Sequence, residues 1–129
     1  MPIVTISILE GKSIDFKNGI HNAIHSALVS AFKIPEWDYN QKINEFNWNN
    51  WKIPDGKTDN FISIEIFVFP GRKKETKKKL YEEIIKNLEA LGINRNDTFI
   101  LLIEQPLENW GIRGGIPADE INLGFNTNV

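Results

Sequence analysis

The chain has 129 residues, of which 41% are hydrophobic and 25% are charged, and its formal net charge is −2. This length fits one domain with a core of its own. The absence of cysteine excludes disulfides, thiolate metal sites and cysteine nucleophiles, and the charge balance argues against a nucleic-acid binder. Because the sequence shows neither a membrane-spanning apolar run nor a signal-peptide pattern, we expect a cytoplasmic protein that does not contact membranes.

The N-terminus combines a methionine, a proline and an alternating strand pattern over residues 3–9. A small residue after the initiator methionine usually allows that methionine to be removed, and Pro2 would then carry a free secondary amine. An ordinary α-amino group titrates near ~8; burial lowers this pKa and a nearby carboxylate raises it. Pro2 is therefore a candidate acid, base or nucleophile. If Met1 is retained, the Pro2 nitrogen is an amide and cannot act as a base.

The first half of the chain predicts a strand, a helix and a second strand. Apolar residues recur at helical spacing over Ser13–Phe32, and Ser13 is a suitable N-cap. The second strand is expected over Tyr39–Phe46. The stretch Asn47–Asn60 holds two tryptophans, several asparagines and a Pro-Asp-Gly turn, which indicates a loop. We expect its aromatic side chains to fix the loop to the core or to a neighbouring subunit.

The second half repeats this order. A strong strand is expected over Ile62–Phe69, followed by a turn and by a helix that runs to about Leu91, with Gly92 as its cap. The last long strand is expected over Thr98–Glu104. The segment 106–115 is expected to be irregular. A short edge strand is expected over Ile121–Val129.

Short motifs support an internal duplication. Residues 9–12 resemble residues 69–72, about sixty positions later, and residues 34–38 parallel residues 93–97. We therefore predict a single α+β domain over residues 1–129, built of two β-α-β units (about 1–60 and 61–129). Two such units give a two-layer fold: a four-stranded sheet with both helices on one face. The other face carries apolar residues, which favours a symmetric oligomer.

The duplication also predicts where a site lies. Arg72 follows the first strand of the second unit, whereas Pro2 begins the first strand of the first unit. If these two strands are antiparallel neighbours across a pseudo-twofold axis, the start of one lies near the end of the other. We therefore expect Arg72 beside Pro2.

These features resemble the tautomerase superfamily, over essentially the whole chain. The resemblance rests on Met1-Pro2, on the turn at 34–38, on Pro70-Gly71-Arg72, and on the segments 104–106 and 110–115. In its length and tandem units the chain is similar to the long-chain group that includes malonate semialdehyde decarboxylase. The resemblance implies a homotrimer in which the amino-terminal proline of each subunit is the catalytic group.

Position by position, the resemblance implies roles for individual residues. Pro2 matches the catalytic proline, Asp38 an aspartate linked to water activation, and Arg72 one of two arginines that hold the substrate carboxylate. Pro70 stands where the family has its second arginine. The resemblance also implies an apolar wall near the proline, formed by Trp110, Ile112 and Ile121. Arg113 is the candidate cation that replaces the missing arginine.

This set predicts an enzyme that acts on a small keto, enol or unsaturated carboxylic acid, without a metal or organic cofactor. The reaction is keto–enol tautomerisation, or hydration or decarboxylation with help from Asp38. An apolar wall lowers the pKa of the Pro2 amine and suits a general base, whereas a charged Asp38 raises it and suits an acid. Activity then rises with pH in the first case and falls in the second. The alternative is a non-catalytic trimer of the same fold that binds a small acid or a protein partner.

Three other patterns have simpler structural explanations. His21 and His25 have the i, i+4 spacing of metal ligands, but no third ligand completes a set, so we expect surface residues and no metal site. The lysines within 73–79 are flanked by glutamates and predict a solvated helix face, which also helps to draw acidic substrates towards the site. The glycine-rich segment 110–115 lacks P-loop spacing and predicts a tight hairpin or bulge.

Overall fold

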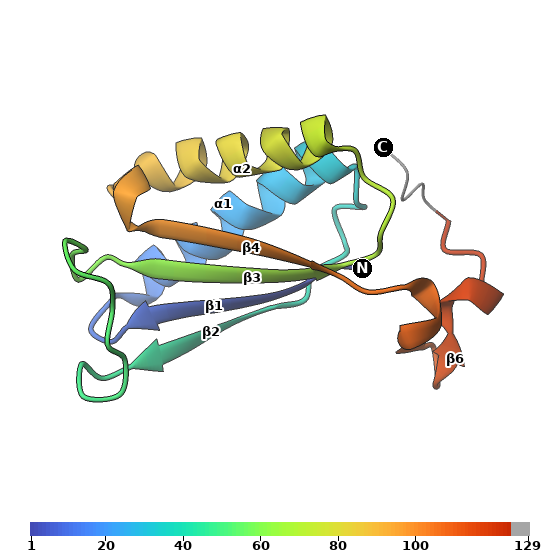
Figure 1. Ribbon diagram of the computed structural model, residues 1–129, viewed down its shortest axis with the longest axis horizontal. Coiled ribbons are helices and arrows are strands. Elements are labelled where there is room, and N and C mark those ends of the chain that lie inside the picture. Colours follow the sequence, from blue (N-terminus) through green and yellow to red (C-terminus); the bar gives the residue numbers. More distant parts are fainter. Residues whose placement is uncertain (125–129) are drawn as a thin grey trace.

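The computed structural model describes residues 1–124 and has two layers, a mixed sheet and a pair of helices that cover one face of it (Figure 1). The sheet order is β2-β1-β3-β4, with parallel outer pairs and an antiparallel central pair. This arrangement confirms the predicted tandem β-α-β fold. The main elements are β1 (Ile3–Leu9), α1 (Ile14–Phe32), β2 (Gln41–Phe46), β3 (Ile62–Val68), α2 (Lys74–Glu89) and β4 (Thr98–Glu104).

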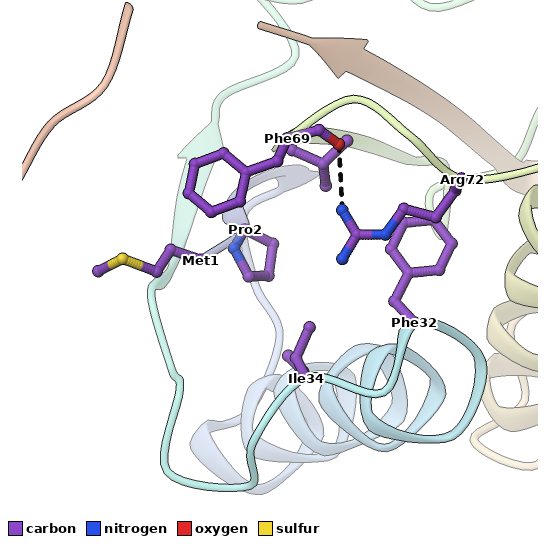
Figure 2. A pocket seen from close by; sticks show the side chains of 7 residues that line it. Met1, Pro2, Phe32, Ile34, Phe69 and Arg72 are labelled. Carbon is purple, nitrogen blue, oxygen red and sulfur yellow. Dashed lines mark hydrogen bonds between the residues drawn. The ribbon is translucent and has the colours of Figure 1, made fainter. Parts of the chain in front are cut away.

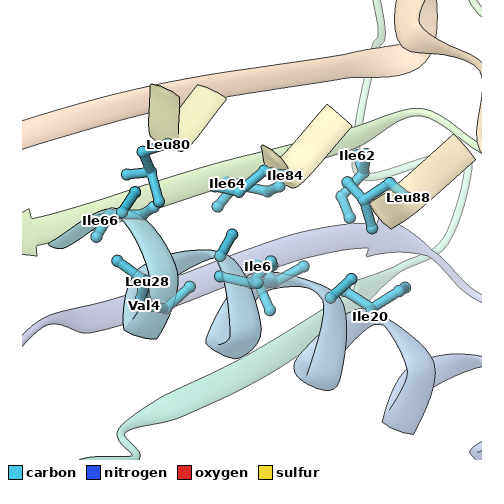
Figure 3. Packing of buried hydrophobic residues seen from close by; sticks show 14 of the residues in the cluster. Val4, Ile6, Ile20, Leu28, Ile62, Ile64, Ile66, Leu80, Ile84 and Leu88 are labelled. Carbon is cyan, nitrogen blue, oxygen red and sulfur yellow. The ribbon is translucent and has the colours of Figure 1, made fainter. Parts of the chain in front are cut away.

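The core lies between the sheet and the helices. Every second residue of β1 and β3 points to this side, and Val4, Ile6, Ile62, Ile64 and Ile66 are fully buried. The helices contribute matching apolar stripes, and each fully buried aliphatic side chain stabilises the fold by about 1.5–3 kcal/mol. The helical residues that meet the strands in Figure 3 are Ile20, Leu28, Leu80, Ile84 and Leu88.

The antiparallel central pair sets the position of the N-terminus. Ile3 pairs with Phe67, and Ile8 pairs with Ile62. The start of β1 therefore lies beside the end of β3, where the chain turns towards α2. This register confirms the topology that the sequence predicted for the neighbourhood of Pro2.

The turns after β1 and β3 show the duplication in backbone geometry. Gly11 has φ +105° and Gly71, sixty positions later, has φ +121°. Residues with a Cβ rarely adopt such positive φ angles, so both turns need glycine. Each turn leads into a helix whose N-cap is extended; Ser13 accepts a hydrogen bond from the Phe16 amide, whereas Lys73 has no side-chain cap bond.

The sheet face opposite the helices is mixed and partly apolar. On β4, Phe99 is 54% exposed and Leu101 is 46% exposed. The register places them beside Ser63 and Glu65 of β3. Among residues 1–124, both long helices lie on the other face (Figure 1). The apolar residues of this face are therefore available for contact with another subunit, as predicted.

The loop 47–60 contains no helix or strand, as predicted. Trp51 packs between Phe46 and Phe61, with ring centroids 5.6 and 5.4 Å away, and so fixes the loop to the sheet. Trp48 is exposed and is not part of this contact.

The segment after β4 is built from short elements. Two 3₁₀ turns (Leu107–Asn109 and Ala118–Glu120) flank a small hairpin of β5 (Gly111–Ile112) and β6 (Ile116–Pro117). The hairpin confirms the expectation for residues 110–115. Residues 121–124 form no strand, and the rest of the edge strand predicted over Ile121–Val129 lies outside the described residues.

Two expectations about α1 and β2 were wrong. His25 is only 7% exposed, because its ring lies against Tyr39 rather than in solvent. The second strand was expected to begin at Tyr39, but β2 begins at Gln41 and Tyr39 lies in the α1–β2 connection.

No group of three or more potential metal-ligating side chains occurs among residues 1–124. Within that range there is also no helix long and apolar enough to cross a bilayer.

Candidate active site

Pro2 is buried at the start of β1 and lines two adjoining depressions. With Met1 in place, the Pro2 nitrogen belongs to a peptide bond. The first depression is a crevice with no room for a water molecule, and its walls come from both halves of the chain (Figure 2). They are Met1, Pro2, Phe32, Ile34, Val68, Phe69 and Arg72. The structure thus brings Pro2 and Arg72 to one crevice, as the duplication predicted.

Arg72 reaches the crevice because the Gly71 turn directs the chain back over the end of β3. Its side chain is 8% exposed. Nη1 donates to the Phe69 carbonyl at 3.0 Å, and the guanidinium carbon lies 4.6 Å from the centre of the Phe32 ring. Burial lowers the pKa of Arg72 and the charge of Glu104 raises it. Because an arginine keeps its charge in proteins, this site holds a desolvated cation.

The Arg72 guanidinium also has unused hydrogen-bonding capacity. Its Nε is buried and has no hydrogen-bond partner among residues 1–124. Figure 2 shows the guanidinium pointing across the crevice towards Pro2. A buried, incompletely paired donor next to an apolar wall is suited to an anion, and a carboxylate matches the two-pronged geometry of arginine.

Asp38 lies on the other side of Pro2 and is 6% exposed. Its Oδ2 is 3.3 Å from the amino nitrogen of Met1, an ion-pair distance. The contact lacks the geometry of a hydrogen bond, so Oδ2 has no hydrogen-bond partner among residues 1–124. The chain therefore buries a carboxylate whose Oδ2 has the charged amino terminus as its partner.

The second half of the duplication provides a contrast. Asp97, the counterpart of Asp38, is also buried. Its two oxygens accept hydrogen bonds from the backbone amide and the hydroxyl of Thr58. Asp97 thus holds the loop 47–60 to the sheet, whereas the Asp38 carboxylate is left for another task.

The electrostatic surroundings act on the terminal amine in opposite directions. Burial, the largest effect, lowers the pKa of the Met1 amine below its ordinary value. Asp38 acts to raise this pKa and Arg72 to lower it. The amine at this position is therefore tuned by the two charged side chains that the sequence singled out.

The second depression is a cavity of about 460 Å³ that shares Pro2 with the crevice. Trp110 forms part of its wall; the indole nitrogen donates to the Gln105 carbonyl at 3.1 Å, and its ring meets Phe69 edge-on at 4.7 Å. Ile112 also lines the cavity, so the structure brings both predicted wall residues to Pro2. The lining comprises Met1, Pro2, Ile3, Asp38, Tyr39, Asn40, Asn109, Trp110, Gly111 and Ile112.

Arg113 and Ile121 are not among the residues that line these two spaces. Arg113 is exposed at the tip of the β5–β6 hairpin with φ +49°, and its Nη1 donates to the Asn122 carbonyl at 3.3 Å. Ile121 is half-buried beyond the hairpin. Their roles in substrate binding stay predictions.

Sequence reasoning missed several lining residues. Tyr39 and Asn40 directly follow Asp38, so their proximity to that aspartate was the available signal. Phe32 ends the predicted helix and Ile34 begins the turn 34–38, yet both reach the crevice. Asn109 lies in a 3₁₀ turn that the sequence did not predict.

Comparisons with known proteins agree with this geometry. A family model described as "Tautomerase enzyme" matches residues 38–113, more than half of the chain. The probable tautomerase YusQ of Bacillus subtilis (strain 168) is 30% identical over 121 residues, which cover 89% of this chain and 95% of YusQ. The chain belongs to the tautomerase family. It is a tautomerase-superfamily enzyme, which favours the enzymatic interpretation over the non-catalytic binding module.

Solved structures show the same fold. FG41 malonate semialdehyde decarboxylase inhibited by 3-bromopropiolate superposes with a TM-score of 0.82 at 24% identity, covering 89% of this chain and 92% of that one. A fused 4-OT described as a symmetric trimer superposes with a TM-score of 0.80 at 20% identity, covering 91% and 96%. The expected similarity to long, two-unit tautomerase-fold proteins is thereby confirmed.

Proposed function

We propose that removal of Met1 frees the Pro2 amine, and that this amine moves protons on a small keto, enol or unsaturated carboxylic acid held by Arg72. The observation that carries the proposal is that Pro2 and a desolvated arginine, from the two halves of the chain, line one crevice. Met1 also lines this crevice, which has no room for a water molecule while Met1 is present. Removal of Met1 therefore opens space for the substrate carboxylate. Arg72 binds the substrate carboxylate and polarises an adjacent carbonyl. Pro2 then takes a proton from the neighbouring carbon or delivers one to it, without a metal or organic cofactor.

Two protonation states of Pro2 give different chemistry. Burial lowers the pKa of the Met1 amine and Asp38 raises it. On the adjacent Pro2 amine we expect burial to favour a neutral base and Asp38 to favour the protonated acid. A base gives a rate that rises with pH through the pKa of the amine, because deprotonation creates the catalyst. An acid gives a rate that falls as the pH rises through the same pKa, because deprotonation removes the catalyst. A pH–rate profile on simple enol acids therefore assigns the role.

Asp38 extends the proposal to hydration and decarboxylation. Asp38 lines the cavity next to Pro2, and removal of Met1 frees its carboxylate from the ion pair to activate water or to orient a β-keto acid. The similar fold of malonate semialdehyde decarboxylase supports a test of these reactions. Pro70, in place of the second arginine, leaves one fewer cation for such substrates. We therefore rank tautomerisation first and test hydration with acetylenic acids.

The assembly belongs to the same proposal. The open sheet face carries exposed Phe99 and Leu101, which a neighbouring subunit would cover. The fused 4-OT structure of the same fold is described as a symmetric trimer. We propose a homotrimer with one site per subunit. The cytoplasmic location stays a prediction that cell fractionation tests.

Turnover by the processed protein tests the function. Intact-mass measurement first verifies that Met1 is absent. Pro2→Ala then replaces the secondary amine by a primary one, and we expect the rate on enol acids to fall about 10²-fold or more, as for loss of a general acid or base. Pro54→Ala, in the exposed part of the loop 47–60, is the matched control. Full activity of Pro2→Ala would refute the proposal.

A further inference from the structure

We propose that His25 is a positioning residue that holds Asp38 against the amino terminus by clamping the chain on both sides of that aspartate. The inference rests on the proposed role of the amino terminus. It goes further by assigning a function to a buried histidine of α1 that does not line either space beside Pro2.

The clamp consists of two contacts from one imidazole ring. Nε2 donates to the carbonyl of Glu36 at 2.9 Å, since a carbonyl oxygen only accepts. The face of the same ring stacks on Tyr39, with centroids 3.5 Å apart and planes 19° from parallel. Glu36 lies two residues before Asp38 and Tyr39 one residue after it. The imidazole therefore fixes the aspartate from both sides without touching the reacting groups.

Backbone bonds determine the shape of this segment, and two histidines link it to α1. Downstream of Asp38, His21 Nδ1 donates to Gln41 Oε1 at 2.9 Å. The Asp38 amide donates to the Pro35 carbonyl and the Tyr39 amide to the Trp37 carbonyl, both at 3.0 Å and both within the turn. Downstream, the Val4 amide donates to the Asn40 carbonyl at 2.9 Å and links the segment to β1. His25 adds a link to α1 on both sides of Asp38 itself.

A clamp is needed because Asp38 is in an unfavourable environment. Burial of a carboxylate is costly, and solvent would satisfy its oxygens better. The partner of Oδ2 is the amino terminus, in an ion pair at 3.3 Å. Unless the segment is held in place, rotation towards solvent would remove the negative charge from the amine.

The second half of the chain shows what replaces the clamp when the aspartate is structural. The residue sixty positions after His25 is Ile85, which cannot donate a hydrogen bond. There the equivalent aspartate, Asp97, is held through its own carboxylate by Thr58. A carboxylate used in this way is no longer available for catalysis. The first half keeps its carboxylate available and uses a histidine to hold the backbone instead.

The pKa of the amino terminus is the direct readout. Asp38 acts to raise the pKa of the Met1 amine, and we expect the same effect on the Pro2 amine once Met1 is removed. This pKa is measured by NMR titration of ¹⁵N-proline-labelled protein from which Met1 has been removed, which needs no substrate. We expect His25→Leu, which removes both contacts, to lower this pKa by about half to one pH unit. Asp38→Asn shifts it in the same direction, and His25→Leu causes no further shift in the Asp38→Asn background. The matched control is Asn18→Ala, at an exposed position of the same helix, which leaves the pKa unchanged.

Two conservative variants separate the contacts and replace His25→Leu if it does not fold. His25→Phe keeps the stacking on Tyr39, and His25→Gln keeps a donor for the Glu36 carbonyl; each is expected to give a smaller downward shift. The proposal is overturned if the pKa is unchanged in these variants, or if Asp38→Asn leaves it unchanged. Loss of the proposed function is seen separately, as absence of turnover of enol acids by the wild-type protein.

Discussion

Replacement of Arg72 by leucine separates binding of the substrate from stability of the fold. In the folded protein the guanidinium has one hydrogen bond to the Phe69 carbonyl, a cation–π contact with Phe32 and a buried Nε without a partner. Loss of the first two destabilises by about 1 and 0.5–2 kcal/mol. Removal of the unpaired donor and of a desolvated charge returns about 1–3 kcal/mol. These contributions largely cancel, so we expect Arg72→Leu to change the free energy of unfolding by no more than about 2 kcal/mol.

The same substitution should strongly reduce activity. Truncating one partner of a buried, hydrogen-bonded charge pair weakens binding by about 2–5 kcal/mol. At about 1.4 kcal/mol per tenfold, a loss of 2–4 kcal/mol lowers kcat/KM for a carboxylate substrate by about 30-fold to 10³-fold. Arg72→Lys keeps the charge but loses the two-pronged contact, so its kcat/KM should lie between those of wild type and Arg72→Leu.

The assays are urea unfolding and steady-state kinetics on the same samples. Arg95→Leu is a matched control, because that arginine is exposed and pairs with Glu89. The reasoning is refuted if Arg72→Leu keeps kcat/KM within threefold of wild type. It is also refuted if the variant unfolds so readily that the loss of activity follows from the loss of folded protein.

The remaining predictions concern Asp38, Asp97 and the open sheet face. Asp38→Asn removes the charge that raises the pKa of the terminal amine, so the limb of the pH–rate profile should move to lower pH by about one unit; a limb that stays or moves up contradicts this. Asp97→Asn should lower the free energy of unfolding by about 1.5–3 kcal/mol through its bonds to Thr58, measured by urea unfolding, while the amine pKa stays unchanged. Leu101→Glu should dissociate the trimer on light scattering; an unchanged mass would place the interface elsewhere.

Much of the fold was predictable because periodicity and turn chemistry are local. The alternation in β1 and β3 and the glycines at 11 and 71 specify strands and turns without reference to the rest of the chain. The duplication then supplied the one long-range relation that mattered. Antiparallel pairing of β1 with β3 brings Pro2 to the turn that carries Arg72. The sequence predicted this proximity on the condition that the two strands pair across a pseudo-twofold axis.

The parts that were missed depend on partners distant in sequence. His25 has the spacing of an exposed pair, and its burial is decided by Tyr39 and the Glu36 carbonyl in a different segment. The contrast between Asp38 and Asp97 likewise depends on Thr58, which lies in the loop 47–60. No local pattern distinguishes an aspartate whose oxygens are satisfied from one whose oxygen is not.

Covalent labelling of the amino terminus tests the central claim most directly. The processed protein is treated with a halopyruvate-type reagent, and mass spectrometry of its peptides locates the label. We predict one label, on the Pro2 nitrogen, which a bound small acid blocks and Arg72→Leu slows. A label on other residues, or an unlabelled Pro2 in protein shown to lack Met1, would contradict the assignment of Pro2 as the catalytic group.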